Sequence, residues 1–353
     1  MALSTSDLDP KRILIVLHGS IGDVTRALPL AAILRRGFPQ AFLAWSIEPA
    51  CAPLLQGNSA IDDVLLFDRR NAWKNAGGFL ARVRAGKFDL ALDLQRIFKS
   101  GFIGWWSGAR RRIGFHRRDS KEFNWIFNNL HIPEYGEEIP KLEHYLKFAD
   151  YLGLERASVQ WDFALTQEEQ NLVDQRLGKN DQPFAVLFVG TRWQSKQWFP
   201  FQMSHCADYL QRHHNLDVVL LGGSEDRNIA EEVQLLCAIN KLVNLVGQTS
   251  LREAIGVIQR AKIAIGPDTG LMHIAAAVRT PVISLWGATR PQRTGPFGFS
   301  ELALQGEAPC VPCQRRTCLI GRICLQSITA EQIGAKIHAA LAGQENAPIN
   351  HAG

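Results

Sequence analysis

The sequence predicts an α/β protein built from two doubly wound parallel sheets, one in each half of the chain. Short apolar runs alternate with helical segments from residue 12 onward, as in strands joined by crossover helices. The runs contain few polar residues, which is typical of strands covered by helices on both faces. The alternation breaks near residues 155–183 and then repeats, and 353 residues suffice for two domains. We therefore expect domains over 1–165 and 180–328, followed by a C-terminal helix over 329–345.

The expected elements follow from these runs and from local start signals. The first half predicts strands over 12–17, 42–47, 63–67 and 89–94 and helices over 24–36, 50–56, 72–85 and 142–154. The second half predicts strands over 184–189, 217–221, 243–246, 262–265 and 282–286, with a small-residue helix over 271–278. Capping boxes at Thr166–Glu169 and Ser250–Glu253 open two further helices, and Pro200 opens another. Between residues 99 and 129 the pattern is too weak to assign elements.

Composition narrows the function classes. Hydrophobic residues make up 46% of the chain and charged residues 21%, as in a water-soluble globular protein. No apolar run is long enough to span a bilayer, and the first ten residues lack the apolar segment of a signal peptide, so we expect a cytoplasmic protein. The net charge of +5 is too small to argue for nucleic acid, but it fits an anionic small substrate or an anionic membrane surface.

The stretch Gly266–Ala277 follows an apolar run, at the carboxyl end of a strand, where open α/β sheets bind ligands. The N–H groups of Thr269 and Gly270 at the following helix start suit a phosphate, and His273 can face the same anion. Asp268 would repel a phosphate, but its carboxylate can accept hydrogen bonds from sugar hydroxyls. It can equally be the N-cap of the helix, and the stretch alone does not decide between the two.

A glycine turn, Gly19-Ser-Ile-Gly-Asp23, follows the first strand. It does not match the Gly-x-Gly-x-x-Gly fingerprint of dinucleotide-binding proteins. Asp23 at the start of the next helix has two readings: a general base facing a cleft, or a helix N-cap.

Two loops of the second half also follow strands. The loop 190–200 contains Thr191 and Lys196, whose hydroxyl and ammonium groups suit a diphosphate, although loop lysines are usually only solvated. The loop 222–226 contains two glycines and Glu225, which can bind ribose hydroxyls or simply favour a helix N-terminus. Several such loops after strands of one sheet indicate a ligand site more strongly than any single loop does.

With these motifs in place, the chain resembles glycosyltransferase family 9, the ADP-heptose:lipopolysaccharide heptosyltransferases of Gram-negative bacteria. The resemblance covers nearly the whole chain. Its most specific parts are Gly22-Asp-Val24, the Thr-Arg…Lys-x-Trp loop 191–198 and Asp268-Thr-Gly-Leu-Met-His273. It implies a GT-B fold, in which two Rossmann-like domains face each other across a cleft. The acceptor would bind the first domain and the nucleotide sugar the second.

The resemblance also implies roles for single residues. Asp23 would be the catalytic base and Asp268 would hold the donor sugar. Lys196 and the turn Thr269-Gly270-Leu271 would hold the diphosphate, with Glu225 near the ribose. The implied reaction is an inverting transfer of heptose from ADP-heptose to a Kdo or heptose residue of the lipid A inner core.

Such a transfer leaves negative charge on the departing diphosphate, which cations and helix-start N–H groups stabilise. Many metal-dependent glycosyltransferases use Asp-x-Asp, which occurs here only at Asp7-Leu-Asp9, before the first strand. We therefore expect no cofactor and no catalytic metal.

Basic residues of the first domain fit an anionic, lipid-linked acceptor. They stand in loops or helix starts after its strands, and each can equally be a solvated surface residue: Arg69, Arg70, Lys74, Lys99 and Lys121. Trp105, Trp106 and the run Arg110–Arg112 fit a peripheral contact with the cytoplasmic face of the inner membrane, or packing in the interior.

Four of the seven cysteines cluster late in the chain, at Cys310, Cys313, Cys318 and Cys324. Their spacing is compact enough for zinc or an iron–sulfur cluster but does not match the common zinc-finger spacings. Reduced loop cysteines or a disulfide are the alternatives.

Two other functions remain open. Another nucleotide-sugar transferase or a nucleotide-sugar epimerase of GT-B fold would share these loops, and only the transferase needs an acceptor. A binding protein that has lost activity is the non-enzymatic alternative, and the joint presence of Asp23, Lys196, Asp268 and His273 argues against it.

Overall fold

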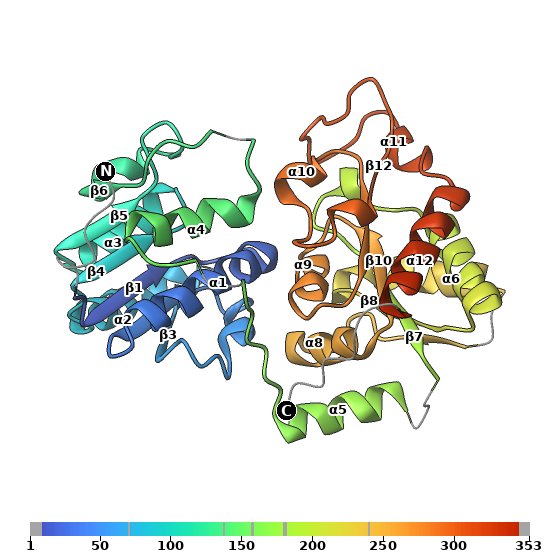
Figure 1. The fold of residues 1–353 in the computed structure, drawn as a ribbon, viewed down its shortest axis with the longest axis horizontal. Coiled ribbons are helices and arrows are strands. Elements are labelled where there is room, and N and C mark those ends of the chain that lie inside the picture. Colours follow the sequence, from blue (N-terminus) through green and yellow to red (C-terminus); the bar gives the residue numbers. More distant parts are fainter. Residues whose placement is uncertain are drawn as a thin grey trace. The chain divides into compact units, whose positions relative to one another are not determined.

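The computed structural model describes residues 9–69, 71–136, 138–156, 159–178, 182–238 and 241–345. The chain divides into two compact units, Met1–Ala164 and Leu165–Gly353. We call them unit 1 and unit 2 and describe each by itself (Figure 1).

Unit 1 contains a six-stranded parallel sheet in the order β3-β2-β1-β4-β5-β6. Its strands are β1 (Arg12–Val16), β2 (Phe42–Ile47), β3 (Asp63–Leu66), β4 (Leu90–Asp93), β5 (Arg111–Gly114) and β6 (Leu130–His131). The central strands β1, β2 and β4 are buried almost throughout, which explains their continuous apolar sequence.

Helices cover both faces of this sheet. On one face, α2 (Ala72–Ala85) and α3 (Phe98–Trp106) bury residues such as Val83 and Ile103 against the strands. Elsewhere in the unit, α1 (Ile21–Gly37) and α4 (Lys141–Tyr151) pack side by side (Figure 1). The short helices η2 (Ala52–Leu55) and η3 (Asn124–Phe127) complete unit 1.

Unit 2 contains a second six-stranded parallel sheet, ordered β12-β11-β10-β7-β8-β9. Its strands are β7 (Phe184–Phe188), β8 (Asp217–Leu221), β9 (Leu242–Asn244), β10 (Ile263–Pro267), β11 (Val282–Trp286) and β12 (Ala303–Gln305). The longer helices are α5 (Gln167–Leu177), α6 (Pro200–His214), α7 (Arg227–Leu236), α8 (Leu251–Arg260), α9 (Gly270–Ala277) and α12 (Ala330–Glu345). The short ones are η4 (Gln194–Lys196), η5 (Ser224–Asp226), α10 (Pro291–Thr294), η6 (Ser300–Leu302) and α11 (Ile323–Gln326).

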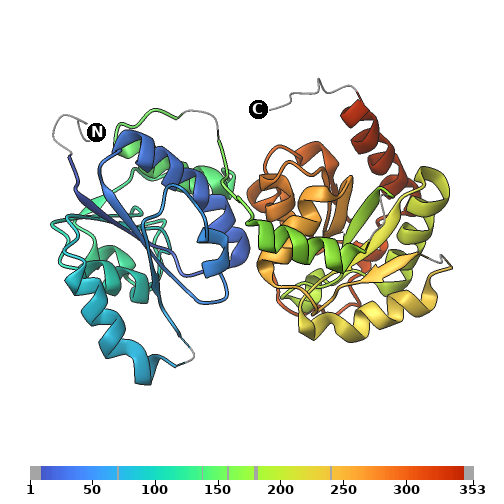
Figure 2. The same cartoon turned by 90° about the horizontal axis from the view of Figure 1, so that it is seen from below.

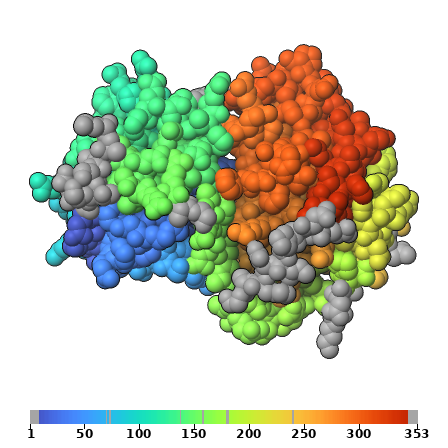
Figure 3. All heavy atoms as spheres, viewed as in Figure 1, coloured from blue at the N-terminus to red at the C-terminus, as the bar shows by residue number. Residues whose placement is uncertain are grey.

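The helices of unit 2 also form two layers. α6 packs against α7 and α12, and their apolar residues join the strands in one buried core. α8 packs against α5 and α9. Seen from below, α5 and α7 run along the unit as separate helices (Figure 2). In the space-filling view, the orange to red segments after β10 form much of the visible face of unit 2 (Figure 3).

Both sheets have the same strand order. The second sheet, read in reverse as β9-β8-β7-β10-β11-β12, matches β3-β2-β1-β4-β5-β6 of the first. In each, the chain starts in the middle, winds to one edge, and returns to continue on the other side. The order therefore reverses between β1 and β4 in unit 1 and between β7 and β10 in unit 2. Ligands of such sheets bind beyond the carboxyl ends of the strands at this switch point. The loops that leave β1, β4, β7 and β10 are thus the candidates for function.

Two helices begin earlier than predicted, α1 by three residues and α9 by one, with consequences for the site. α1 begins at Ile21 with Ser20 as N-cap, so Asp23 lies within the first turn and is not the cap. α9 begins at Gly270 with Thr269 as N-cap, so Asp268 is not the cap of that helix. The capping boxes of α5 and α8, and Pro200 at the start of α6, are confirmed.

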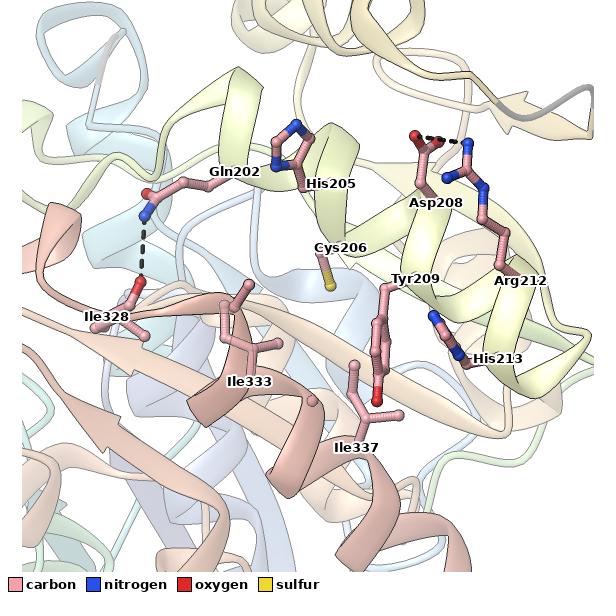
Figure 4. A pocket seen from close by; sticks show the side chains of 12 residues that line it. Gln202, His205, Cys206, Asp208, Tyr209, Arg212, His213, Ile328, Ile333 and Ile337 are labelled. Carbon is pink, nitrogen blue, oxygen red and sulfur yellow. Dashed lines mark hydrogen bonds and ion pairs between the residues drawn. The ribbon is translucent and has the colours of Figure 1, made fainter.

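A pocket of unit 2 lies apart from these loops. It is a groove between α6 and α12, with Cys206, Ile333 and Ile337 at its floor and His205 and Arg212 at its rim (Figure 4). It shares no residue with the strand-end loops described below. Its apolar floor continues the core under α6.

Across the described ranges, none of the helices combines the length and apolar character that crossing a bilayer requires. The aromatic residues of α3 are nevertheless partly exposed, with Trp105 at 49% and Trp106 at 38%. Neither tryptophan is therefore a fully buried core residue.

We predict that Gly266→Ala destabilises unit 2. A Cβ at Gly266 in β10 would lie 2.7 Å from the Cβ and 2.9 Å from the carbonyl oxygen of Phe188 in β7, and this backbone cannot move without disturbing the sheet. Overpacking of this kind costs about 1–3 kcal/mol, measurable as a lower urea midpoint. Gly78→Ala in α2 is the control, because its Cβ would meet nothing within 4 Å. Equal stability of the two variants would contradict the close approach.

Candidate active site

A lysine–carboxylate pair joins the loops after β7 and β10 at the switch point of unit 2. The Nζ atom of Lys196 lies 2.6 Å from Oδ2 of Asp268, and the two side chains are 14% and 11% exposed. The Oδ2 atom also accepts a hydrogen bond of 2.7 Å from the hydroxyl of Thr289, in the loop after β11. The hydroxyl of Thr191 donates to the carbonyl oxygen of Asp268 at 2.9 Å. The structure thus brings Thr191, Lys196 and Asp268 together, as predicted from the strand ends.

The N-terminus of α9 stands directly beside this pair. Thr269, Gly270 and Leu271 are half-buried, and the first N–H groups of a helix have no partner within it. An ammonium group and a helix N-terminus at the same place favour an anion. His273, predicted to face this anion, is 5% exposed on the buried side of α9.

Aromatic packing helps to fix Lys196. Its Nζ atom lies 4.3 Å from the ring centre of Trp193, within the range of a cation–π interaction. Trp198, two residues further on, is fully buried in the core of unit 2. Lys196 thus contacts a half-buried tryptophan and lies two residues before a fully buried one.

Glu225 lies in the loop after β8, as predicted. Its side chain forms no ion pair among the described residues. It is exposed, whereas its neighbour Asp226 is 8% exposed and accepts a hydrogen bond of 2.9 Å from the N–H of Gly223. Burial raises the pKa of Asp226. Gly190 leaves the room for this carboxylate, because a Cβ there would overlap it. Asp226 thus has a structural position, and Glu225 faces solvent.

The cysteine-containing segment braces the loop that carries Lys196. The hydroxyl of Ser195 donates to the carbonyl oxygen of Arg315 at 2.5 Å, and Arg322 donates to the carbonyl of Gln197 at 2.6 Å. The thiols are free, and no three His, Cys, Asp or Glu side chains of the described residues are placed to hold a metal ion. The segment 310–324 is therefore hydrogen-bonded to the loop that carries Lys196.

Unit 1 has its own carboxylate–lysine pair at its switch point. Asp23, on the first turn of α1 after β1, is contacted at Oδ1 by the Nζ atom of Lys141 at the start of α4. The guanidinium of Arg26 lies 2.8 Å from the same oxygen, and the hydroxyl of Tyr145 lies 3.4 Å from it. The Asp23 side chain is 19% exposed.

These neighbours decide the protonation state of Asp23. Burial alone favours the protonated acid, but the charges of Lys141 and Arg26 outweigh it and hold the pKa of Asp23 well below its usual range. Burial, with the charge of Asp23, raises the pKa of Tyr145, so its phenol keeps the proton that it donates. Asp23 is therefore ionised at any pH at which the protein works.

His18 lies two residues after β1, in the loop that leads to this carboxylate. Its ring stacks on Phe67 with a centroid distance of 4.5 Å, and its Nε2 atom lies 3.1 Å from the hydroxyl of Ser46. Burial, and then the charge of Lys99, lowers the pKa of His18 to about 3. His18 is thus a neutral ring, unable to act as a proton donor near pH 7.

The predicted basic residues are distributed around the carboxyl edge of unit 1. Lys74, Lys99 and Lys121 are exposed, and Lys99 stands close enough to His18 to affect its titration. Arg69 is 3.3 Å from Glu48 and is partly neutralised by it. Arg70 lies outside the described residues. So do positions 7 and 8 of the Asp-x-Asp pattern.

Sequence reasoning missed four residues that contact the two carboxylates. Arg26 follows Asp23 by three positions on a helix, a spacing that allows an ion pair and could have been found. Thr289 follows a predicted strand, so a systematic survey of strand ends would have included it. Lys141 and Tyr145 come from a helix more than a hundred residues away, and no local pattern indicates them.

Comparison with known proteins adds the family. A sequence profile of glycosyltransferase family 9 (heptosyltransferase) matches residues 78–324. The lipopolysaccharide core heptosyltransferase OpsX of Haemophilus influenzae is 26% identical over 293 residues, covering 82% of each chain.

Solved structures share the fold. The family 9 glycosyl transferase of Veillonella parvula has a TM-score of 0.81 at 20% identity, covering 95% of this chain and 98% of its own. The E. coli heptosyltransferase WaaC, solved with ADP, has a TM-score of 0.73 at 22% identity, covering 93% and 99%.

These matches confirm the expected GT-B class, with its two Rossmann-like parallel sheets. They also confirm that the chain is a glycosyltransferase. The profile covers more than half of the chain, and the chain therefore belongs to glycosyltransferase family 9, the heptosyltransferase family.

Proposed function

We propose that this enzyme moves heptose from ADP-heptose to the inner core of lipopolysaccharide, with inversion at the transferred carbon. The observation that carries the donor half of this proposal is the pair Lys196–Asp268 beside the N-terminus of α9. Two of the relatives named above, OpsX and WaaC, are heptosyltransferases, and WaaC was solved with ADP.

The donor's diphosphate fits the anion site of unit 2. Its negative charge grows as the sugar leaves, and Lys196 with the N–H groups of the turn Thr269-Gly270-Leu271 would stabilise that charge. Asp268 would accept hydrogen bonds from heptose hydroxyls through the oxygen that Lys196 and Thr289 do not occupy. Glu225 in the loop after β8 would reach the ribose, as acidic residues after Rossmann strands do.

Asp23 is the proposed base. It would take the proton of the acceptor hydroxyl while the hydroxyl oxygen forms a bond to the anomeric carbon. The bond from that carbon to the diphosphate oxygen breaks, and its electron pair leaves with ADP. Attack from the side opposite the leaving group gives inversion. The ionised state of Asp23 supports this role, because only a carboxylate can accept the proton.

The acceptor is proposed to be anionic and lipid-linked, carrying Kdo or heptose on lipid A. The exposed cations Lys74, Lys99 and Lys121 and the partly paired Arg69 suit its phosphates and acidic sugars. Lys99 is the best placed, since it stands near His18 in the loop after β1.

A lipid-linked acceptor also calls for contact with a membrane. The surface of α3 and η3 exposes Phe98, Trp105, Phe123 and Ile126, each between 48% and 73%. We call these four residues the aromatic face. Ring contacts link two of its members, because Phe98 packs on Phe127, Phe127 on Phe102 and Phe102 on Trp105. Aromatic side chains edged by cations are typical of proteins that bind peripherally to anionic membranes.

The first prediction tests Asp23. Asp23→Asn keeps the shape of the side chain but cannot accept the proton, so turnover should fall by about 10²–10⁴-fold. Asp23→Ala should be equally inactive. Both should also unfold at a lower temperature, because Lys141 and Arg26 lose their partner. If Asp23→Asn turns over near the wild-type rate, Asp23 is a structural residue only. Product analysis with and without acceptor separates transfer from epimerisation.

The second prediction concerns metals. We propose that Lys196 and the α9 N-terminus carry the charge of the leaving group without a divalent cation. Turnover should then be unchanged after treatment with EDTA, measured by ADP release from the donor in the presence of acceptor. A loss of turnover that added Mg²⁺ restores would contradict this proposal.

The third prediction concerns the aromatic face. Trp105→Ser and Phe123→Ser together should weaken binding to phosphatidylglycerol vesicles by about tenfold or more, since burial of one large apolar side chain contributes about 1.5–3 kcal/mol. Sedimentation with vesicles measures this. Leu235→Ser is the control, because Leu235 is 87% exposed on α7, in unit 2. Equal loss in the control, or no loss in the double variant, would rule out this surface.

A further inference from the structure

The two oxygens of Asp23 are used very differently. Oδ1 is contacted by the ammonium of Lys141, by the guanidinium of Arg26 and by the phenol of Tyr145. Oδ2 accepts only two long hydrogen bonds within the described residues, 3.4 Å from the N–H and 3.3 Å from the hydroxyl of Ser20. A carboxylate oxygen has room for further donors when its contacts are so long.

Lys141 is unusual for its position in the fold. It is the first residue of α4, where the helix macrodipole disfavours a cation. Its side chain is only 22% exposed and meets the carboxylate of a different helix. Arg26, 9% exposed and three residues from Asp23, already supplies one cation to that carboxylate. Helix stability alone therefore does not account for a second, inward-facing cation here.

We propose that Lys141 is a positioning residue for the transfer reaction: it binds Oδ1 of Asp23 and so presents Oδ2 to the acceptor hydroxyl. This inference rests on the proposed role of Asp23 as base. Lys141 fixes the rotation of the carboxyl group, because a donor on α4 and a donor on α1 converge on one oxygen. The proton moves to Oδ2, and Oδ1 keeps its three contacts throughout the step.

The same arrangement sets the pH range of the base. Two cations make Asp23 a weak base, but they keep it ionised until the pH falls well below its usual pKa. The groups that face it are Arg26 on α1 and Lys141 and Tyr145 on α4, with Arg96 acting on the last two from the loop after β4. A base with a depressed pKa loses activity only as the pH drops through that low value. Removing one cation must therefore move the acid limb of the activity profile upward.

The test is the pH dependence of kcat/KM in Lys141→Met, which keeps the length of the side chain but removes its charge. The wild type should show no acid limb from Asp23 in the pH range in which the protein is folded. In Lys141→Met only Arg26 still opposes burial, which favours the protonated acid, so the pKa of Asp23 should rise and an acid limb should appear. Lys141→Arg should restore the wild-type pH profile. Lys147→Met is the matched control, because it removes the same charge from the same helix away from Asp23. Lys141→Gln serves as a second uncharged variant if Lys141→Met does not fold.

The role of Lys141 and the role of Asp23 as base can be tested separately. A pH profile of kcat/KM in Lys141→Met and Lys141→Gln that superimposes on the wild-type profile would overturn the role of Lys141. A role in stability alone would lower the unfolding temperature and leave the pH profile unchanged. An active Asp23→Asn enzyme would instead overturn the proposed base, and it is measured first. An acid limb that appears equally in Lys147→Met would show a general charge effect and would also overturn the assignment.

Discussion

A carboxylate held by a lysine lies at the switch point of each sheet, and the candidate residues of each unit are arranged around that unit's own ion pair. In unit 1 the pair is Asp23 with Lys141, and in unit 2 it is Asp268 with Lys196. Each pair is largely removed from solvent, so neither charge could stay there alone without a large cost. Because each carboxylate is paired with a lysine, both charges can remain ionised beside the carboxyl ends of buried strands, where an ionic substrate can bind.

The topology explains why the pairs form where they do. In both sheets the order of strands reverses beside the first strand, which leaves a gap between the loops on either side. In unit 2 the strands on either side of this gap are β7 and β10. Lys196 lies in the loop after β7 and Asp268 in the loop after β10. In unit 1 the partner of Asp23 comes from α4, which packs along α1. The two halves thus share a sheet topology but fill the switch point from different elements.

The sequence was enough to predict the class of fold, the central strands and the polar residues at their ends. These depend on local patterns: apolar runs, glycine turns and capping boxes, all of which lie within a few residues of each other. It was not enough for the edge of unit 1, where β5, β6 and η3 follow no clear period between Arg111 and His131. It also left open whether Asp23 and Asp268 are N-caps, because sequence patterns locate a helix start only to within a few residues. Partners such as Lys141 are set by tertiary packing, which no local pattern contains.

The central claim is a division of labour: unit 2 binds the nucleotide and unit 1 supplies the base. Calorimetric titration of ADP into the wild type, Lys196→Met and Asp23→Asn tests it most directly. The account predicts that Asp23→Asn binds ADP with the wild-type Kd, whereas Lys196→Met binds it about 10–100-fold more weakly, because one charged hydrogen bond contributes about 1.5–3 kcal/mol. An unchanged Kd in Lys196→Met, or an equal loss in both variants, would contradict the account.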